Sequence, residues 1–316
     1  MHPNLKFFKN SKTLAVDEFF QNVLYDNKIG YYTTKQPFGK YGDFLTAPKI
    51  SNLFSEIIGI WLISTWQICG KPKNFNIIEL GPGDGSLVEV LLKTFKNFPE
   101  FEKSSKIYLY ETSSYLKKLQ KRKIKTNKVK WINNFNCIKK GPTFFLGNEF
   151  FDSLPIKQFK RKNNILYEKY YQLDNKNKIK EVYKLASKKN EKIINSFETL
   201  KKLKFIEFPK LGLIELNKII KKIYLNNGGL LLIDYGFFTP NNRDTLQSII
   251  RHKKNNSLKN LGKADVTSHV NFQLLKEFFL KNNLKVKKVV TQKFFLERMG
   301  IIKRAHILSK HMKFSD

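Results

Sequence analysis

The chain has 316 residues, 41% of them apolar and 14% aromatic, so it is too apolar for a disordered protein and long enough to bury a core of its own. Its formal net charge is +33, from 59 lysines and arginines against 26 acids, a balance that often indicates a polyanionic partner. Arginine accounts for only six of those 59 residues, and the lysines are spread from Lys6 to Lys313. Phosphate recognition favours arginine and a single charged face. We therefore attribute the charge to compositional drift and predict no specific nucleic-acid partner.

Two cysteines, Cys69 and Cys137, stand far apart, so spacing indicates neither a disulfide framework nor a cysteine-based zinc site, and we predict no metal. No apolar run approaches the ~20 residues that a membrane-spanning helix needs. The first sixteen residues contain lysine but no acid and no arginine, which leaves a weak organellar address open.

Residues 1–75 are predicted to form a mostly helical cap, with a lid loop rich in glycine, proline and aromatic residues after Gly30. From residue 76 onward short apolar strands alternate with helices, a pattern typical of a parallel sheet covered on both faces. We expect strands at 76–80, 107–110, 129–132, 143–146, 230–236, 286–292 and 301–308. We expect helices at 86–95, 115–123, 212–225 and 271–282.

Residues 156–208 instead alternate aliphatic, aromatic and lysine residues, which predicts an antiparallel β insertion. The sequence therefore predicts an α/β, Rossmann-like fold with a mostly parallel seven-stranded sheet. In this division the cap is 1–75, the ligand-binding domain is 76–155 with 209–316, and the β-rich insertion is 156–208.

The first expected strand ends in a glycine turn, Gly81-Pro82-Gly83-Asp84-Gly85. A dinucleotide site requires a further Gly or Ala where Ser86 stands, and a P-loop requires Gly-Lys-Ser or Gly-Lys-Thr, so both are excluded. With Glu79 before the turn and Glu111 ending the next strand, the pattern suits S-adenosylmethionine, which has two ribose hydroxyls and no pyrophosphate. The alternative is a tight connection that binds nothing.

A second cluster, Asn148-Glu149-Phe150-Phe151-Asp152, follows the expected strand at 143–146. It falls at the carboxyl edge of the sheet, where open α/β folds bind ligands. Carboxylates at such an edge are costly without partners. We therefore predict functional roles for Glu149 and Asp152 and core roles for the two phenylalanines.

Together these clusters resemble the MidA-like methyltransferases, the family that includes the mitochondrial complex I assembly-factor arginine methyltransferases and their bacterial relatives. The residues that carry the resemblance span most of the chain: Gly30-Tyr31-Tyr32, Gly42-Asp43-Phe44, Thr46-Ala47-Pro48, Ile50-Ser51, Glu79 to Gly85, Asn148 to Asp152 with Leu154-Pro155, Ile233 to Gly236, Ala264 to Thr267, and His269-Val270. The chain departs from the family at Lys49, Asn271 and Arg243, where Glu, Asp and Gly are usual. We interpret it as a cytoplasmic bacterial member, or a protein of the organellar matrix if its source is eukaryotic.

The resemblance implies a class I methyltransferase that uses S-adenosylmethionine and methylates an arginine of a complex I subunit. We expect Glu149 and Asp152 to hold the guanidinium as catalytic residues. The expected cofactor-binding residues are Asp43, Thr46, Glu79, Gly81, Pro82, Gly83, Gly85, Glu111 and Asn148. A nucleic-acid methyltransferase and a non-catalytic complex I assembly factor are the alternatives, and a homodimer stays open.

Overall fold

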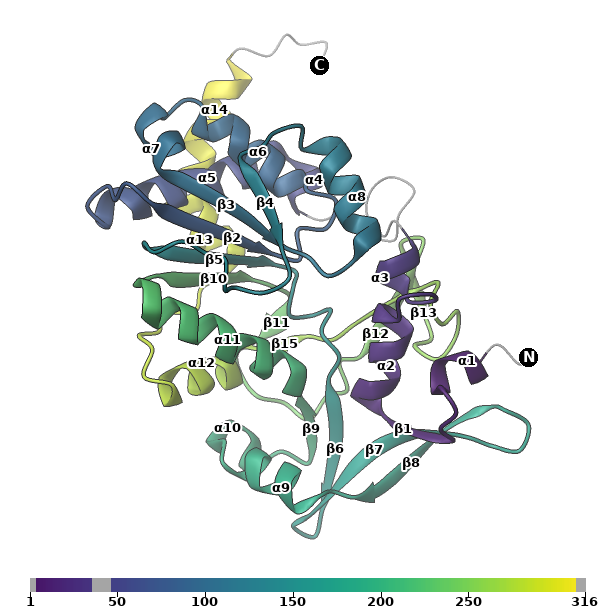
Figure 1. Cartoon of the computed structure of the whole chain (residues 1–316). Coiled ribbons are helices and arrows are strands. Elements are labelled where there is room, and N and C mark those ends of the chain that lie inside the picture. Colours follow the sequence, from purple (N-terminus) through teal and green to yellow (C-terminus); the bar gives the residue numbers. More distant parts are fainter. Residues whose placement is uncertain (1–3, 36–46, 311–316) are drawn as a thin grey trace.

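The computed structural model describes residues 4–35 and 47–310. A parallel five-stranded sheet in the order β10-β5-β2-β3-β4 forms its centre (Figure 1). Its strands are β2 (Phe75–Leu80), β3 (Ser105–Tyr110), β4 (Val129–Ile132), β5 (Thr143–Asn148) and β10 (Gly229–Ile233). Because the chain runs outward from β2 first to β3 and β4 and then to β5 and β10, the strand order reverses between β2 and β5. Such a reversal opens a crevice at the carboxyl ends of the two strands.

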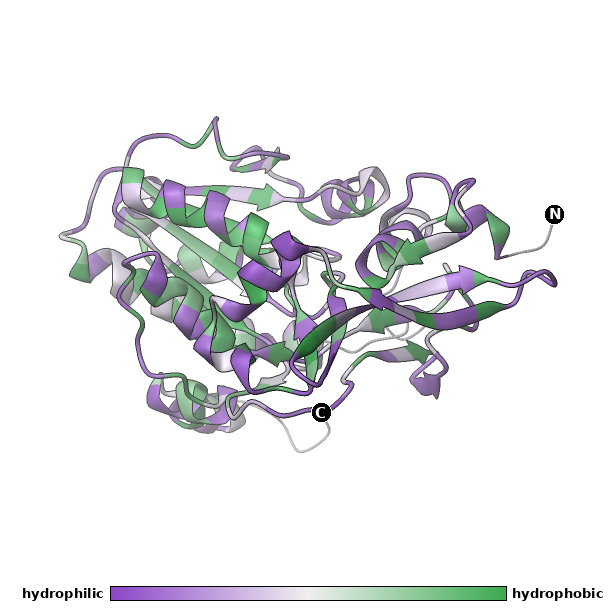
Figure 2. Cartoon of the chain, turned by 90° about the horizontal axis from the view of Figure 1, so that it is seen from below, coloured by the Kyte–Doolittle hydropathy of each residue, from purple (hydrophilic) through white to green (hydrophobic). Residues whose placement is uncertain are grey.

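Helices cover both faces of this sheet, so its strands must be apolar on both sides. All six residues of β2 are buried, and successive residues of β5 enter opposite cores, Phe145 on one face and Leu146 on the other. Figure 2 shows mostly apolar strands in the sheet and mixed helices around it. One face carries α5 (Asn52–Ile68), α6 (Ser86–Phe95), α7 (Pro99–Ser104), α13 (Gln292–Arg298) and α14 (Ile301–Ser309). The other carries α11 (Lys210–Asn226) and α12 (Phe272–Lys281).

The predicted class of fold is confirmed, but the seven-stranded sheet is not: the parallel sheet has five strands in the described residues. The strands expected at 286–292 and 301–308 are wrong, because residues 286–291 belong to no helix or strand and α14 occupies 301–308. Thr291 begins α13 by accepting a hydrogen bond from the Phe294 amide on its side chain. Phe295 and Met299 both pack on the core beneath α5. They are four residues apart, which is the spacing of one face of a helix and not of a strand.

A second, antiparallel sheet has the order β1-β7-β6-β9, with β8 paired to β7. Its strands are β1 (Thr13–Ala15), β6 (Lys157–Lys162), β7 (Ile165–Leu173), β8 (Ile179–Leu185) and β9 (Phe205–Phe208), and α9 (Lys188–Asn195) and α10 (Glu198–Lys201) connect β8 to β9.

The start of the chain belongs partly to this second sheet. β1 pairs with β7, and Phe19 and Phe20 of α2 (Val16–Tyr25) pack edge-on against Tyr171 of β7. Within the range predicted as one cap, α5 therefore covers the parallel sheet while α2 shares a core with the insertion. The other short helices there are α1 (Leu5–Phe8), α3 (Tyr31–Thr34) and α4 (Ala47–Ile50).

Residues between β10 and α12 form two small sheets beside the carboxyl edge of the parallel one (Figure 1). Their strands are β11 (Gly236–Phe237), β12 (Gln247–Ile250), β13 (Lys253–Asn255), β14 (Asp265–Thr267) and β15 (Val270–Asn271). The side chain of Asn271 accepts from the Leu274 amide and caps α12, so this departure from the family keeps a capping residue. None of the described helices is long and apolar enough to cross a membrane.

Candidate active site

The glycine turn between β2 and α6 has backbone angles that residues with a side chain could adopt only with strain. Gly81, Gly83 and Gly85 have φ angles of 58°, 56° and 82°, in the left-handed region that glycine adopts without penalty. A Cβ atom at Gly81 would lie 2.8 Å from the Phe150 ring, and one at Gly85 would lie 2.9 Å from Ile124. The turn therefore requires glycine both for its backbone angles and for its close packing, and glycine lets a ligand approach the main-chain N–H groups.

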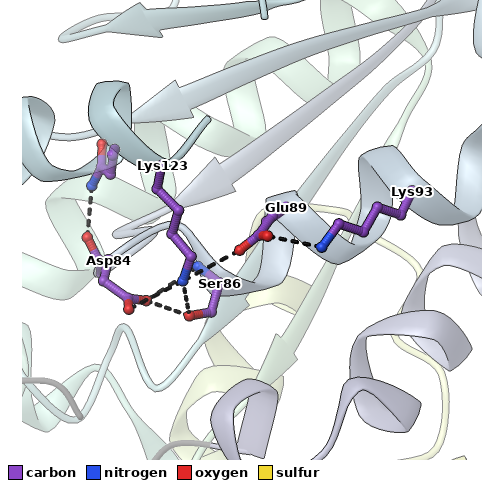
Figure 3. A network of polar contacts seen from close by, with 7 residues as sticks. Asp84, Ser86, Glu89, Lys93 and Lys123 are labelled. Carbon is purple, nitrogen blue, oxygen red and sulfur yellow. Dashed lines mark hydrogen bonds and ion pairs between the residues drawn. The ribbon is translucent and has the colours of Figure 1, made fainter. Parts of the chain in front are cut away.

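Helix α8 (Ser114–Lys123) fixes the turn from outside (Figure 3). Lys123 Nζ lies 3.3 Å from Asp84 Oδ2 and 2.7 Å from Ser86 Oγ. Asp84 Oδ1 in turn accepts from the Ser86 amide at 3.1 Å, at the start of α6. These contacts link the glycine turn to α8 and to the start of α6.

Glu111 follows β3 and is buried beside the turn. Its Oε1 accepts from the Ser113 amide at 2.7 Å and its Oε2 from Gln120 Nε2 at 3.2 Å. Gln120 Nε2 also donates to the Gly83 carbonyl at 2.8 Å, so one side chain holds both Glu111 and the turn. Burial raises the pKa of Glu111, because removal from water disfavours the ionised form.

Two buried oxygens at this end have no hydrogen-bond partner among the described residues, Glu79 Oε2 and Asn148 Oδ1. Burial, followed by the nearby charge of Asp84, raises the pKa of Glu79 to about 8. Buried acceptors are rarely left without donors in folded proteins. These two atoms, from the ends of β2 and β5, therefore mark a place for a ligand that donates hydrogen bonds.

The turn after β5 carries Glu149, whose φ is +50°, a strained value for a residue with a side chain. The Glu149 amide donates to the Ile233 carbonyl at 2.8 Å, and Asp234 Oδ2 accepts from the Phe151 and Asp152 amides at 2.9 and 3.3 Å. The end of β10 therefore dictates the shape of the turn after β5. This turn places Glu149 and Asp152 together, as predicted, with Phe151 in the core.

Four carboxyl groups gather here, Glu149, Asp152, Asp234 and Asp265, which we call the acid cluster. Burial and then the charges of Asp234, Asp265 and Glu149 raise the pKa of Asp152 well above its usual range. Burial also raises the pKa values of Glu149 and Asp234. Acids crowded in this way favour a bound cation or a proton.

Asp234 and Asp265 lie in segments that carry the family resemblance, but neither is among the predicted site residues. Asp265 comes from β14, 2% exposed, and reaches the cluster only because the 265–268 segment lies against the turn, where the Ser268 amide donates to the Asp152 carbonyl at 2.9 Å. The signal available in the sequence was an acid inside an apolar run, Ala264-Asp265-Val266. Two tyrosines, Tyr25 and Tyr32, also line the site.

A single cavity of ≈ 890 Å³ connects the glycine turn with the acid cluster. Of the predicted residues, Glu79, Gly81, Pro82, Gly83, Glu111, Asn148, Glu149 and Asp152 line it. Gly85 shapes the turn without lining the cavity, and Asp43 and Thr46 lie outside the described residues. No metal-binding group of three or more His, Cys, Asp or Glu occurs in the described parts of the chain.

The cavity is acidic although the chain is strongly basic. Among the described residues nine acids line it, Asp17, Glu18, Glu79, Asp84, Glu111, Glu149, Asp152, Glu215 and Asp265. Lys210 is the only lysine in this lining, which includes no arginine among the described residues. Acidic side chains therefore predominate over basic ones in the described lining of the cavity.

Residues 57–290 match the protein family described as "putative S-adenosyl-L-methionine-dependent methyltransferase". The chain belongs to this family. As a family member it is an S-adenosylmethionine-dependent methyltransferase, which confirms the predicted cofactor and class of enzyme. The strand-order reversal and the glycine turn place its cavity where such enzymes bind ligands.

The curated relatives include mitochondrial protein arginine methyltransferases named NDUFAF7. The human protein is 29% identical over 326 residues, which cover 95% of this chain and 73% of the relative. The Drosophila melanogaster homologue is 27% identical over 90% of this chain and 71% of its own length. These relatives confirm the resemblance to the MidA-like family.

A solved structure from Burkholderia thailandensis, described as a "likely methyl transferase" bound to S-adenosyl-homocysteine, has a similar fold. Its TM-score is 0.79 at 18% identity, over 99% of this chain and 82% of the other. The likeness extends over both sheets and confirms the predicted class I methyltransferase fold.

Proposed function

We propose that this methyltransferase methylates arginine side chains of a protein, and that the substrate is a respiratory complex I subunit during assembly. The observation that carries the proposal is the acid cluster at one end of an acid-lined cavity, in a chain whose net charge is +33. The named activity of the NDUFAF7 relatives supports arginine as the acceptor. The family resemblance suggests complex I.

The glycine-turn end of the cavity fits S-adenosylmethionine. Glu79 Oε2 and Asn148 Oδ1, which have no hydrogen-bond partner among the described residues, suit the ammonium of its methionine part. Glu111 suits the ribose hydroxyls. The glycines allow the ligand to approach the backbone of the turn. When bound, this cofactor supplies an electrophilic methyl group on a sulfonium centre.

The acid cluster addresses the difficulty of a guanidinium acceptor. An arginine side chain is protonated at any physiological pH, and its lone pairs are delocalised. A guanidinium has three nitrogens. The carboxylates of Glu149 and Asp152 bind the two that do not react, hold positive charge on them and leave the third nitrogen free to attack. When a guanidinium nitrogen gains a methyl group, the guanidinium must lose one proton to keep its single positive charge, and the raised pKa of Asp152 suits this carboxylate to accept that proton from the nitrogen that it binds.

The direct test is methylation by the purified protein of paired synthetic peptides, identical except that one member of each pair has lysine in place of arginine. We expect S-adenosylmethionine-dependent methylation of the arginine peptides, detected by mass spectrometry, and none of the lysine peptides. The Asp152→Asn variant serves as the inactive control. Methylation of lysine peptides or of nucleic acid instead would contradict the proposal.

The cellular test compares complex I subunits from cells with and without this protein. We expect one methylated arginine to disappear from the subunits in its absence and to return with the wild-type gene but not with Asp152→Asn. Unchanged methylation together with defective assembly would favour a non-catalytic assembly factor.

A further inference from the structure

Tyr32 of α3 contacts both ends of the cavity. Its main-chain carbonyl accepts from Ser113 Oγ at 2.8 Å, and Ser113 is the residue whose amide binds Glu111. Its phenol hydroxyl donates to Asp265 Oδ1 at 2.7 Å. One residue therefore connects the loop that carries Glu111 with a carboxylate of the acid cluster.

Asp265 is held in a single orientation at the cavity wall. Besides the Tyr32 phenol, its Oδ1 accepts from the Val266 amide at 2.9 Å, and β14, which carries Asp265, pairs with β12 in register Asp265↔Ile249. Its side chain is buried, yet the residue lines the cavity. A carboxylate fixed in this way loses little conformational entropy on binding a cation.

The support of Tyr32 is itself rigid. Tyr25 of α2 stacks on Tyr32 with ring centroids 5.3 Å apart, and the Tyr25 hydroxyl donates to the Ser153 carbonyl at 3.0 Å. Ser153 directly follows Asp152. The two tyrosines thus fix Asp265 relative to the turn that carries Glu149 and Asp152.

We infer that Asp265 is a third carboxylate that contacts the cationic acceptor, and that Tyr32 is a positioning residue that orients it and ties its position to the cofactor-binding loop. The inference rests on the proposed function. A guanidinium has five N–H donors in a fixed plane, and in a water-excluded cavity each donor left without an acceptor weakens binding. Glu149 and Asp152 lie on one turn, whereas Asp265 approaches from a different sheet, so the three can surround one planar cation.

The test uses the full chain loaded with S-adenosylhomocysteine and titrated separately with N-acetylarginine methylamide and N-acetyllysine methylamide. The variants are Asp265→Asn and Tyr32→Phe. Their matched controls are Glu100→Gln, which removes an exposed carboxylate on α7, and Tyr224→Phe, which removes a phenol hydrogen bond to Asn282 far from the cavity. Methyl transfer to the arginine ligand gives KM and kcat for each variant.

We expect Asp265→Asn to weaken binding of the arginine ligand by roughly tenfold or more, the size of a lost hydrogen bond to a charged group. S-adenosylhomocysteine affinity should stay within about twofold in both variants, because neither side chain is a cofactor ligand. Tyr32→Phe should raise KM by a smaller factor with less effect on kcat, the result expected when a carboxylate is kept but no longer oriented. The controls should match the wild type.

The inference is overturned if Asp265→Asn and Tyr32→Phe bind the ligand and turn it over like their controls. It is also overturned if both variants lose cofactor affinity and ligand affinity in equal measure, because that indicates a structural role. If the wild type binds the lysine ligand in preference and Asp265→Asn loses that binding, the proposed arginine specificity fails while the role of Asp265 stands. If the wild type binds neither cation, both fail.

Discussion

Glu149 and Asp152 occupy a turn that the protein holds in a strained conformation, with φ of +50° at Glu149. Strain of about 1–3 kcal/mol at one residue persists only where the surroundings impose it, and here Ile233 and Asp234 impose it through their contacts with the turn. The conformation aims two carboxylates into one cavity. This is the arrangement expected of groups that act together on a substrate.

We expect Glu149→Gln and Asp152→Asn each to lower kcat for an arginine peptide by about 10²-fold or more, because each removes a preorganised charge from the reacting centre. Their affinity for S-adenosylhomocysteine should be little changed. Radiometric methyl transfer and calorimetry measure the two quantities. Full activity in both variants would remove these carboxylates from the catalytic site.

Glu111→Ala should weaken S-adenosylhomocysteine binding by about tenfold or more, since a hydrogen bond to a charged group contributes ~1.5–3 kcal/mol. Calorimetry of the purified variant measures this, with Glu100→Ala on the exposed surface as the matched control. An affinity equal to that of the control would show that Glu111 does not contact the cofactor.

The buried carboxyl of Glu79 predicts a pH dependence of stability. Its pKa in the folded protein is about 8 against about 4.3 when unfolded, so the folded state holds the proton more tightly. The contribution of this group is thus most favourable below pH ~4 and is lost as the pH rises towards 8. Glu79→Gln should therefore stabilise the ligand-free protein more at pH 8 than at pH 5, by up to a few kcal/mol.

Urea unfolding of wild type and Glu79→Gln at the two pH values measures the difference directly. A stability gain that does not change with pH would show that Glu79 is already ionised in the folded protein. Glu79→Gln should also weaken cofactor binding. Together the two results would mean that the buried acid lowers the stability of the wild type but is needed to bind the cofactor.

The sequence was sufficient to place the residues that lie next to a strand end. Glu79, Glu111 and Asn148 directly follow or end apolar runs, so the rule that parallel strands end at one edge brings them together. Asp265 and Tyr32 could not be found in this way. They are more than two hundred residues apart and meet through a single hydrogen bond, which depends on how the small sheet of β12 to β14 packs.

At the scale of elements, runs of apolar residues in the sequence predicted the strands of the parallel sheet correctly, but they did not predict the structure of the residues after α12. β2 and β5 are short, almost wholly buried runs, which only a covered strand explains. Between residues 284 and 310 the only buried side chain is Leu296, and α14 has no buried residue. It contacts α5 through the Arg304–Glu56 ion pair at 2.7 Å and packs Ile301 on the core, contacts that no local sequence pattern shows.

The antiparallel sheet contains a buried ionic group that joins three elements. Lys157 of β6 lies 2.9 Å from Asp17 of α2 and 2.6 Å from Glu168 of β7, with all three side chains at most 7% exposed. Asn190 donates to the second oxygen of Glu168. Because Asp17 also lines the cavity, this lysine neutralises an acid at the cavity wall.

Lys157→Met should lower the free energy of unfolding by about 3–5 kcal/mol, because it leaves two buried carboxylates without their cation. Lys71→Met, which breaks the exposed pair with Glu100, should change it by less than ~0.5 kcal/mol. Urea denaturation followed by circular dichroism compares them. If the two variants are equally stable, the buried ion pairs make no net contribution to the fold.

At the scale of the whole molecule, the distribution of charge matters more than its sum. The net charge of +33 suggests an anionic partner, yet nine acids of the described residues line the cavity that connects the glycine turn with the acid cluster. A long-range positive field and a short-range negative site act in opposite directions on a cationic substrate. The target arginine should therefore be presented by a segment whose other charges are acidic.

We expect peptides with acidic residues flanking the arginine to have a lower KM than peptides with lysine flanks, because the flanks meet the lysine-rich surface while the guanidinium enters the cavity. The difference should be large at 10 mM salt, where the screening length is ~30 Å, and small at 300 mM salt, where screening is strong. The value of kcat should depend little on either variable, since the acid cluster is buried and weakly screened. Initial-rate kinetics on one matched peptide pair at the two salt concentrations measure these effects. A KM that depends on neither the flanking residues nor the salt would show that the surface lysines take no part in substrate binding.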